Sequence, residues 1–238
     1  MNRKKLLLFP LVTVLMVSIF LSALAQKAPA FAPANEMERR RQAMYCFFDA
    51  AFGSEYGGSS GLVRWGETVR LSLEGDYTEE DEAFAMDFLK QLREAAIPGM
   101  PEVIRVDALD TPNIRVTFAP LDRLNDYVTN YVTGNWGFFG YRYEEYLITR
   151  ASIAIASDIT GQEARNHLFL EELVGALGLA TDIYTYSDSI IYQPWTEVQT
   201  LSDLDWLMLT YLYSPLLEPG MSVPQAHAEL FDTLAPYR

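Results

Sequence analysis

The sequence predicts an α+β fold in which a small mixed sheet is followed by C-terminal helices. Two observations support this class. Segments in which apolar and polar residues alternate, as in half-buried strands, gather around one helical segment before residue 156. After that point, helix-capping residues precede apolar stretches with helical spacing. An order in which the strands come first and the helices come last is typical of α+β domains.

Each expected element has a local signal. Strands are predicted where apolar residues alternate with polar ones, and helices where a capping residue precedes apolar residues at helical spacing. In chain order, the expected elements are a helix over 36–51, a strand over 69–75, a helix over 79–97, strands over 103–106, 114–118 and 147–156, and helices over 161–177, 203–213 and 223–234.

Capping residues mark the starts of these helices. Asn35, Thr78, Ser202 and Ser222 each stand where a side-chain oxygen can accept a hydrogen bond from the first helical turn. The run from Thr160 to Glu163 matches the capping-box pattern and predicts the start of the helix that follows it.

The segment over 121–146 carries no clear element signal. It is rich in Tyr, Asn and Gly and is interpreted as a long irregular segment. Irregular segments of this length are uncommon in compact domains and are often functional. The alternative is an aromatic loop that packs on the core.

The N-terminus has the parts of a secretory signal over residues 1–25. A charged start precedes an apolar run over 6–24, and Ala23 to Ala25 fit the small-x-small cleavage rule. The run approaches the ~20 residues that span a bilayer, so an uncleaved anchor is the alternative. Either interpretation predicts an exported domain, with 26–35 as a linker and 36–238 as a single domain.

Composition excludes some classes of function. The formal net charge of −14 disfavours nucleic acid as a partner because an acidic surface repels phosphates. Membrane contact is expected only through an uncleaved N-terminal segment. Cys46 is the single cysteine, so the chain forms no internal disulfide and no cysteine-based structural zinc site.

The segment over 171–182 reads EELVGALGLATD and resembles the active-site helix of metzincin, in particular matrixin-like, zinc peptidases. Their motif is His-Glu-x-x-His-x-x-Gly-x-x-His, in which two histidines on one helix face bind zinc and the glutamate is the general base. Glu172 matches the base and Gly178 matches the glycine that ends the helix. The resemblance implies a zincin-like fold.

The three positions that hold histidine ligands in that motif are occupied by Glu171, Gly175 and Thr181. Further on, residues 189–194 (SIIYQP) resemble the Met-turn, with Ile191 in place of methionine. The resemblance therefore implies a degenerate peptidase that has lost its zinc ligands.

A second resemblance is closer. Three groups of residues are similar to the pattern of a bacterial family known only as domain of unknown function 2927, a family with a zincin-like fold and no established activity. They are Arg64-Trp65, Glu171-Glu172-Leu173 with Leu177-Gly178-Leu179, and Leu212-Tyr213 with Pro219-Gly220-Met221.

The first functional hypothesis is an exported, non-catalytic pseudo-metalloprotease without a cofactor. Its cleft is expected to bind an extended peptide, a protein or an envelope component by strand addition to 147–156 as an edge strand. Glu172 stands at the position of the general base, and the degenerate site is expected to leave it inactive. The expected cleft residues are His167, Glu171, Gly175, Gly178, Thr181, Asp182 and Tyr192, and the Tyr-rich segments over 127–146 and 184–192 are expected to line the cleft.

Two alternatives remain open. One is a divalent-metal hydrolase or peptidase in which His167, Glu171 and Asp182 hold zinc and Glu172 is the general base, because this ligand set is chemically acceptable for zinc. The other is a structural envelope protein with no function in the cleft. A further interpretation is that residues 163–177 form an ordinary amphipathic helix in which Glu171 and Glu172 are solvated.

Overall fold

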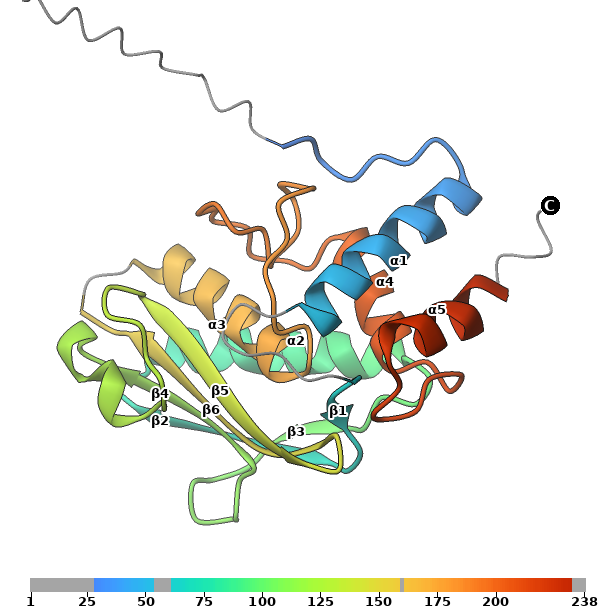
Figure 1. Cartoon of the computed structure of the whole chain (residues 1–238). Coiled ribbons are helices and arrows are strands. Elements are labelled where there is room, and N and C mark those ends of the chain that lie inside the picture. The colour runs from blue at the N-terminus through green and yellow to red at the C-terminus, as the bar shows by residue number, and fades with distance from the viewer. Residues whose placement is uncertain (1–27, 54–60, 159–160, 233–238) are drawn as a thin grey trace, which may run out of the picture.

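The computed structural model describes residues 28–53, 61–158 and 161–232. A twisted six-stranded sheet lies at its centre, with α2 and α3 packed on one face (Figure 1). Beside the sheet, α1 packs against α4 and α5. The elements are α1 (Glu36–Phe52), β1 (Arg64–Trp65), β2 (Val69–Gly75), α2 (Glu79–Ala95), β3 (Val103–Arg105), β4 (Ile114–Ala119), the 3-10 helix η1 (Leu121–Asp126), β5 (Gly137–Glu144), β6 (Leu147–Ala156), α3 (Gln162–Ala176), α4 (Asp203–Leu212) and α5 (Val223–Asp232).

The sheet is mixed. Strands β3, β2, β4 and β6 lie side by side in that order and run parallel, and β1 pairs in parallel with the start of β6. Strand β5 runs antiparallel to β6 and packs against α3. The predicted α+β class, with a small mixed sheet, one central helix and C-terminal helices, is confirmed.

The predicted edge strand is wrong. Strand β6, over Leu147–Ala156, lies between β4 and β5, and β5 is the strand at the border of the sheet. Residues 121–146 are also more regular than expected, because they contain η1 and β5. The sequence of β5, GFFGYRYE, hides its alternation because aromatic residues face both sides of the sheet and glycine interrupts them.

Most of the predicted caps are confirmed. Asn35 accepts a hydrogen bond from the Glu38 N–H, and Thr78 and Ser202 both form complete capping boxes. The expected capping box at the start of α3 is not formed, because the N-cap is Gly161, which has no side chain to accept the bond. Thr160 lies outside the described residues.

One continuous core joins the sheet to the helices around it, and Cys46 is buried within it as a free thiol. Burial raises the pKa of this thiol to about 12, so the reactive thiolate is disfavoured. A smaller apolar cluster, which includes Leu124 and Phe138, packs η1 against the opposite face of the sheet.

Residues 28–35, expected to form a linker, pack on the rest of the described chain. The Phe31 N–H donates a hydrogen bond to the Asp188 carboxylate at 2.8 Å, and the Ser187 N–H donates to the Pro29 carbonyl at 3.0 Å. The expected signal or anchor over 1–25 lies outside the described residues. Within the described ranges, no helix has the length and apolar character needed to cross a membrane.

Candidate functional site

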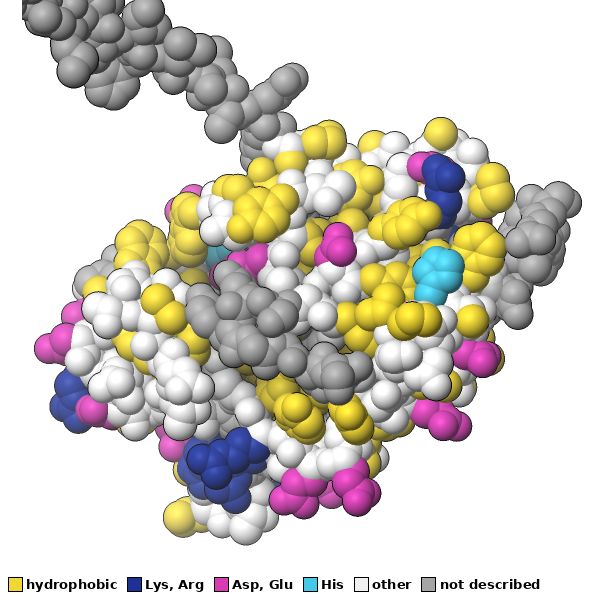
Figure 2. Space-filling view, viewed as in Figure 1, with side chains coloured by type: hydrophobic (Ala, Val, Ile, Leu, Met, Phe, Trp, Pro, Cys, Tyr) yellow, Lys and Arg dark blue, Asp and Glu magenta, His cyan; other side chains and the backbone are white. Residues whose placement is uncertain are grey.

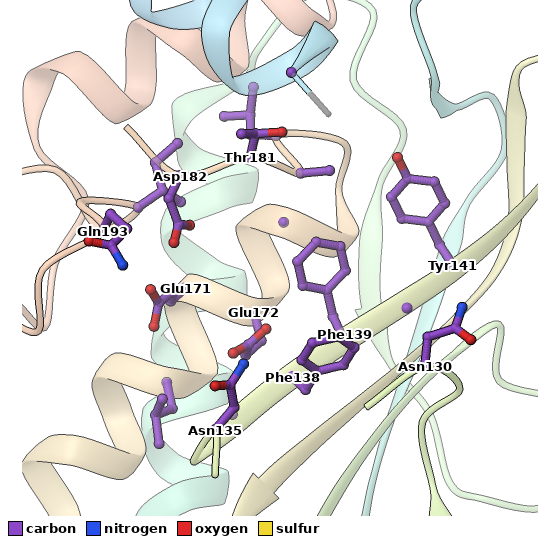
Figure 3. Close-up of a pocket in the computed structure, with 18 of the residues that line it drawn as sticks. Asn130, Asn135, Phe138, Phe139, Tyr141, Glu171, Glu172, Thr181, Asp182 and Gln193 are labelled. Atoms are coloured by element: carbon purple, nitrogen blue, oxygen red, sulfur yellow. The ribbon is translucent and has the colours of Figure 1, made fainter. Parts of the chain in front are cut away.

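A cavity of about 630 Å³ lies between β5, α3 and the loop that follows α3 (Figure 3). Much of the segment over 134–143 forms one wall, and Trp195 lines the cavity from the segment before α4. Residues singled out in the sequence line the other walls: Glu171, Glu172, Gly175, Thr181 and Asp182. The remaining three, His167, Gly178 and Tyr192, lie outside the lining.

Glu172 is the most deeply buried carboxyl group of the cavity, with a relative exposure of 8%. Burial raises its pKa well above the ordinary value, and the nearby charges of Glu171 and Asp182 add to the effect. A Cβ on Gly137 of β5 would lie 2.5 Å from Glu172 Oε1, so the strand approaches this carboxyl group closely. Glycine at position 137 leaves space for the carboxyl group.

Gly175, at the second ligand position of the metzincin motif, is covered by an aromatic ring. A Cβ at this position would lie 2.4 Å from Cε1 of Phe139, which projects from β5 toward α3 (Figure 3). Glycine at position 175 therefore accommodates the ring. The place where a histidine side chain would begin is filled by hydrocarbon.

Thr181, at the third ligand position, is held against α1. Its N–H donates to the Ala50 carbonyl at 3.0 Å, and a Cβ on Gly53 would lie 2.7 Å from Thr181 Oγ1. These contacts fix the start of the loop at the C-terminal end of α1 and place Asp182 at the cavity.

His167 is buried under the segment before α4 instead of facing the cavity. Its Nδ1 lies 2.7 Å from the Val198 carbonyl, and because a carbonyl only accepts, Nδ1 is the protonated nitrogen. Burial lowers the pKa of the ring, which favours the neutral form. Its Nε2 lies 3.5 Å from Glu171, so these two proposed zinc ligands do come together.

Gly178 and Tyr192 have structural positions. Gly178 has a φ of 123°, a conformation that favours glycine, and it turns the chain from α3 into the loop. The Tyr192 hydroxyl accepts a hydrogen bond from the Ala28 N–H at 3.4 Å, on the linker side of the Met-turn-like segment. In that segment, Ile191 and Gln193 are the residues that line the cavity.

The described residues do not fit a zinc ion of the metzincin type. Of the three ligand positions, only Glu171 supplies a strong ligand atom, and Gly175 is closed by a phenyl ring. Among the residues with described positions, no group of three His, Cys, Asp or Glu side chains is placed to hold a metal ion. His167 and Glu171 therefore lack a third partner of this kind there.

As expected, residues of the Tyr-rich segment over 127–146 line the cavity, but sequence reasoning did not foresee that they form β5, and it missed the segment before α4. Phe139 and Tyr141 line the cavity from β5, Asn135 and Trp136 line it from the turn before this strand, and Trp195 lines it from the segment before α4. The Trp136 and Trp195 rings lie 5.3 Å apart. The unusual Tyr, Asn and Gly content of 121–146 was the available signal, but it did not reveal a strand.

Comparison with known proteins places the chain in a family. The model of the family described as "Protein of unknown function (DUF2927)" matches residues 40–232. The chain belongs to this family. No curated protein matched it. Among solved structures, "Structure of Myroilysin" is similar at 16% sequence identity and a TM-score of 0.39, covering 64% of this chain and 83% of that one.

Replacing Glu172 with glutamine is expected to stabilise this DUF2927 protein at pH 8. The folded state raises the pKa of Glu172, so it binds this proton more tightly than the unfolded chain does. The contribution of Glu172 to stability is therefore full below its ordinary pKa and is lost as the pH rises through the folded-state value. Glutamine is neutral throughout, and we expect the melting temperature at pH 8 to rise by at least ~2 °C.

Thermal unfolding at pH 4 and pH 8 checks this result. At pH 4 the Glu172→Gln variant and the unmodified protein should melt together, because both side chains are neutral. Glu163→Gln is the matched control, because Glu163 lies on the same helix, at its first turn and away from the cavity lining. A Glu172→Gln variant that melts at a lower temperature at pH 8 would show that the ionised carboxylate is favoured in the fold.

Proposed function

We propose that this protein is an exported, non-catalytic module that binds an extended peptide along β5. The observation that supports the proposal most directly is that the long cavity follows this strand at the border of the sheet. Within the described part of the chain, β5 pairs only with β6, so no described strand pairs with its other side. Strand addition to such an edge is a recurring mode of peptide recognition.

The ladder between β5 and β6 indicates which backbone groups face a peptide. The Ala156 N–H donates to the Trp136 carbonyl at 2.7 Å. Because hydrogen-bonded pairs alternate in an antiparallel ladder, the N–H and C=O groups of Gly137, Phe139 and Tyr141 point away from β6. These three residues supply the hydrogen bonds that a peptide strand requires.

The absence of catalysis is proposed from the chemistry of Glu172 and of the ligand positions. A general base must be ionised to accept a proton, whereas burial favours the protonated form of Glu172. Without a metal ion, bound water also keeps a pKa near ~15.7 and is a poor nucleophile. Export is proposed from the signal-like segment over 1–25.

Selection from a random decapeptide library, followed by N-methylation of a selected peptide, tests strand addition. Methyl groups on alternate residues of the peptide remove the donors that face β5, and we expect at least a tenfold loss of affinity. Methylation of the other set of residues should leave affinity within about threefold, because those N–H groups face solvent. Equal losses from both sets would contradict strand addition.

Metal content and peptidase activity test the non-catalytic part of the proposal. After refolding in zinc, we expect less than about a tenth of an equivalent by elemental analysis, because a true site fills stoichiometrically. The selected peptide should also remain uncleaved. Stoichiometric zinc with cleavage that is lost in Glu172→Gln would instead support a hydrolase that uses His167 and Glu171.

A further inference from the structure

Three acidic side chains line one cavity without a basic side chain among its described lining residues. Glu171 and Glu172 belong to α3, and Asp182 belongs to the loop that follows (Figure 3). On the face of the molecule shown in Figure 2, Lys and Arg lie toward the periphery. The cavity is therefore a region of negative potential with partly apolar walls, where the field of the carboxylates is weakly screened.

Glu172 is a polar group that points into the cavity without a hydrogen-bond partner among the described residues. It is more than nine-tenths buried, and Oε1 faces the wall formed by Gly137. A carboxyl group held this deeply without a donor is unfavourable, and more so when it is charged. A hydrogen-bond donor with a positive charge would satisfy this group and offset the repulsion from Glu171 and Asp182.

The aromatic walls favour an organic cation. Trp136 and Trp195, with relative exposures of 42% and 48%, contact each other at the cavity, and Tyr141 and Tyr143 line its other part. Aromatic faces attract a cation within ~6 Å, most strongly over tryptophan. A planar guanidinium group can stack on such a face and donate to a carboxylate at the same time.

We propose that the cavity binds an arginine side chain of the peptide that adds to β5, with its guanidinium group donating to Glu172 between Glu171 and Asp182. This inference rests on the proposed function, because β5 would hold the peptide backbone. The cavity volume of about 630 Å³ is large enough for a long side chain, and binding sites for small molecules typically span ~300–1,000 Å³. Lysine carries the same charge, but its ammonium group is compact and cannot stack on an aromatic ring as a planar guanidinium group does.

Binding of the guanidinium group is coupled to the proton on Glu172. From α3 and its following loop, Glu171 and Asp182 raise the pKa of this group, and β5 presents no charged side chain to the cavity at this point. A bound cation favours the ionised form, so binding releases a proton. Affinity is therefore expected to increase as the pH rises from 5 to 8.

Two acetylated and amidated pentapeptides test the proposal with the full protein: Ala-Ala-Arg-Ala-Ala and the same peptide with citrulline, which has nearly the shape of arginine without its charge. Calorimetric titration at pH 8 is expected to show at least tenfold tighter binding of the arginine peptide. Titration in buffers of different ionisation enthalpy should show proton release with the arginine peptide alone. In Glu172→Gln, the ratio of the affinities for the arginine and citrulline peptides should fall below threefold. In Glu163→Gln, this ratio should stay at tenfold or more.

The outcomes separate this inference from the proposed function. Equal binding of both peptides would overturn the arginine site and leave strand addition intact. An arginine preference that persists in Glu172→Gln would assign the effect to the acidic surface as a whole and would also overturn the proposal. Binding of neither peptide would overturn both ideas.

Discussion

Replacement of Asp81 by alanine is expected to lower the free energy of unfolding by about 3–5 kcal/mol, because it leaves a buried guanidinium group without its partner. Asp81 and Arg165 are almost fully buried and form an ion pair between α2 and α3. Arg165 Nε donates to Asp81 at 3.0 Å, and its guanidinium group also lies 4.9 Å from the Phe118 ring centroid. Asp81 further accepts the Thr78 N–H at 2.7 Å, so the change also removes half of a capping box.

Urea denaturation at pH 7 measures this effect, and Asp87→Ala is the matched control because Asp87 is exposed on the same helix. Burial alone would raise the pKa of Asp81, but hydrogen bonds from Arg165, Thr78 and Gln162 outweigh it and lower the pKa. The stabilisation is therefore present above the ordinary pKa and is lost as the pH falls through the folded-state value. A loss below ~1 kcal/mol at pH 7 would contradict a role for this pair in holding α3.

Replacement of Gly178 by alanine is expected to cost about 3 kcal/mol, because two unfavourable effects add. Its φ of 123° is a conformation that L side chains rarely adopt. A Cβ would also lie 2.8 Å from the Val63 carbonyl oxygen and 3.2 Å from the Leu212 side chain, and the carbonyl belongs to the backbone and cannot rotate away. Because this turn leads α3 into the cavity loop, peptide affinity should fall as well.

Gly161→Ala provides the control for this prediction. Gly161 is the N-cap of α3 and has an ordinary φ of −74°, and a Cβ at this position would meet no described atom within 4 Å. Alanine there should cost about 1 kcal/mol at most, the usual loss at an N-cap, because no clash or backbone strain is added. Thermal or urea unfolding of both variants checks the difference, and similar costs at the two positions would show that the turn at Gly178 tolerates a side chain.

Local signals in the sequence were sufficient for most elements but not for the cavity. The caps at Asn35, Thr78 and Ser202 depend on residues within one helical turn, so they were predicted correctly. Strand β5 exists because it pairs with β6, and its aromatic and glycine-rich sequence carries no simple alternation. The sequence indicated that this segment lines the cleft, but it did not predict that the segment is a strand.

Local sequence signals also do not determine where individual site residues lie, because their contacts come from distant segments. Helical spacing grouped His167 with Glu171, and the structure brings them to 3.5 Å. Only the distant segment that contains Val198 determines that the ring is buried and neutral. The partner of Gly175 is likewise far away in sequence, at Phe139, and no local pattern in α3 indicates it.

The contact between Phe139 and Gly175 constrains how this scaffold can change over evolution. A histidine at position 175 would meet the phenyl ring before it reached a metal ion, since even a first side-chain carbon approaches the ring to 2.4 Å. A ligand of the metzincin type at position 175 therefore requires a smaller residue on β5 first. Substitutions in the opposite order are penalised one at a time, so a mutational barrier stands before a histidine at this position.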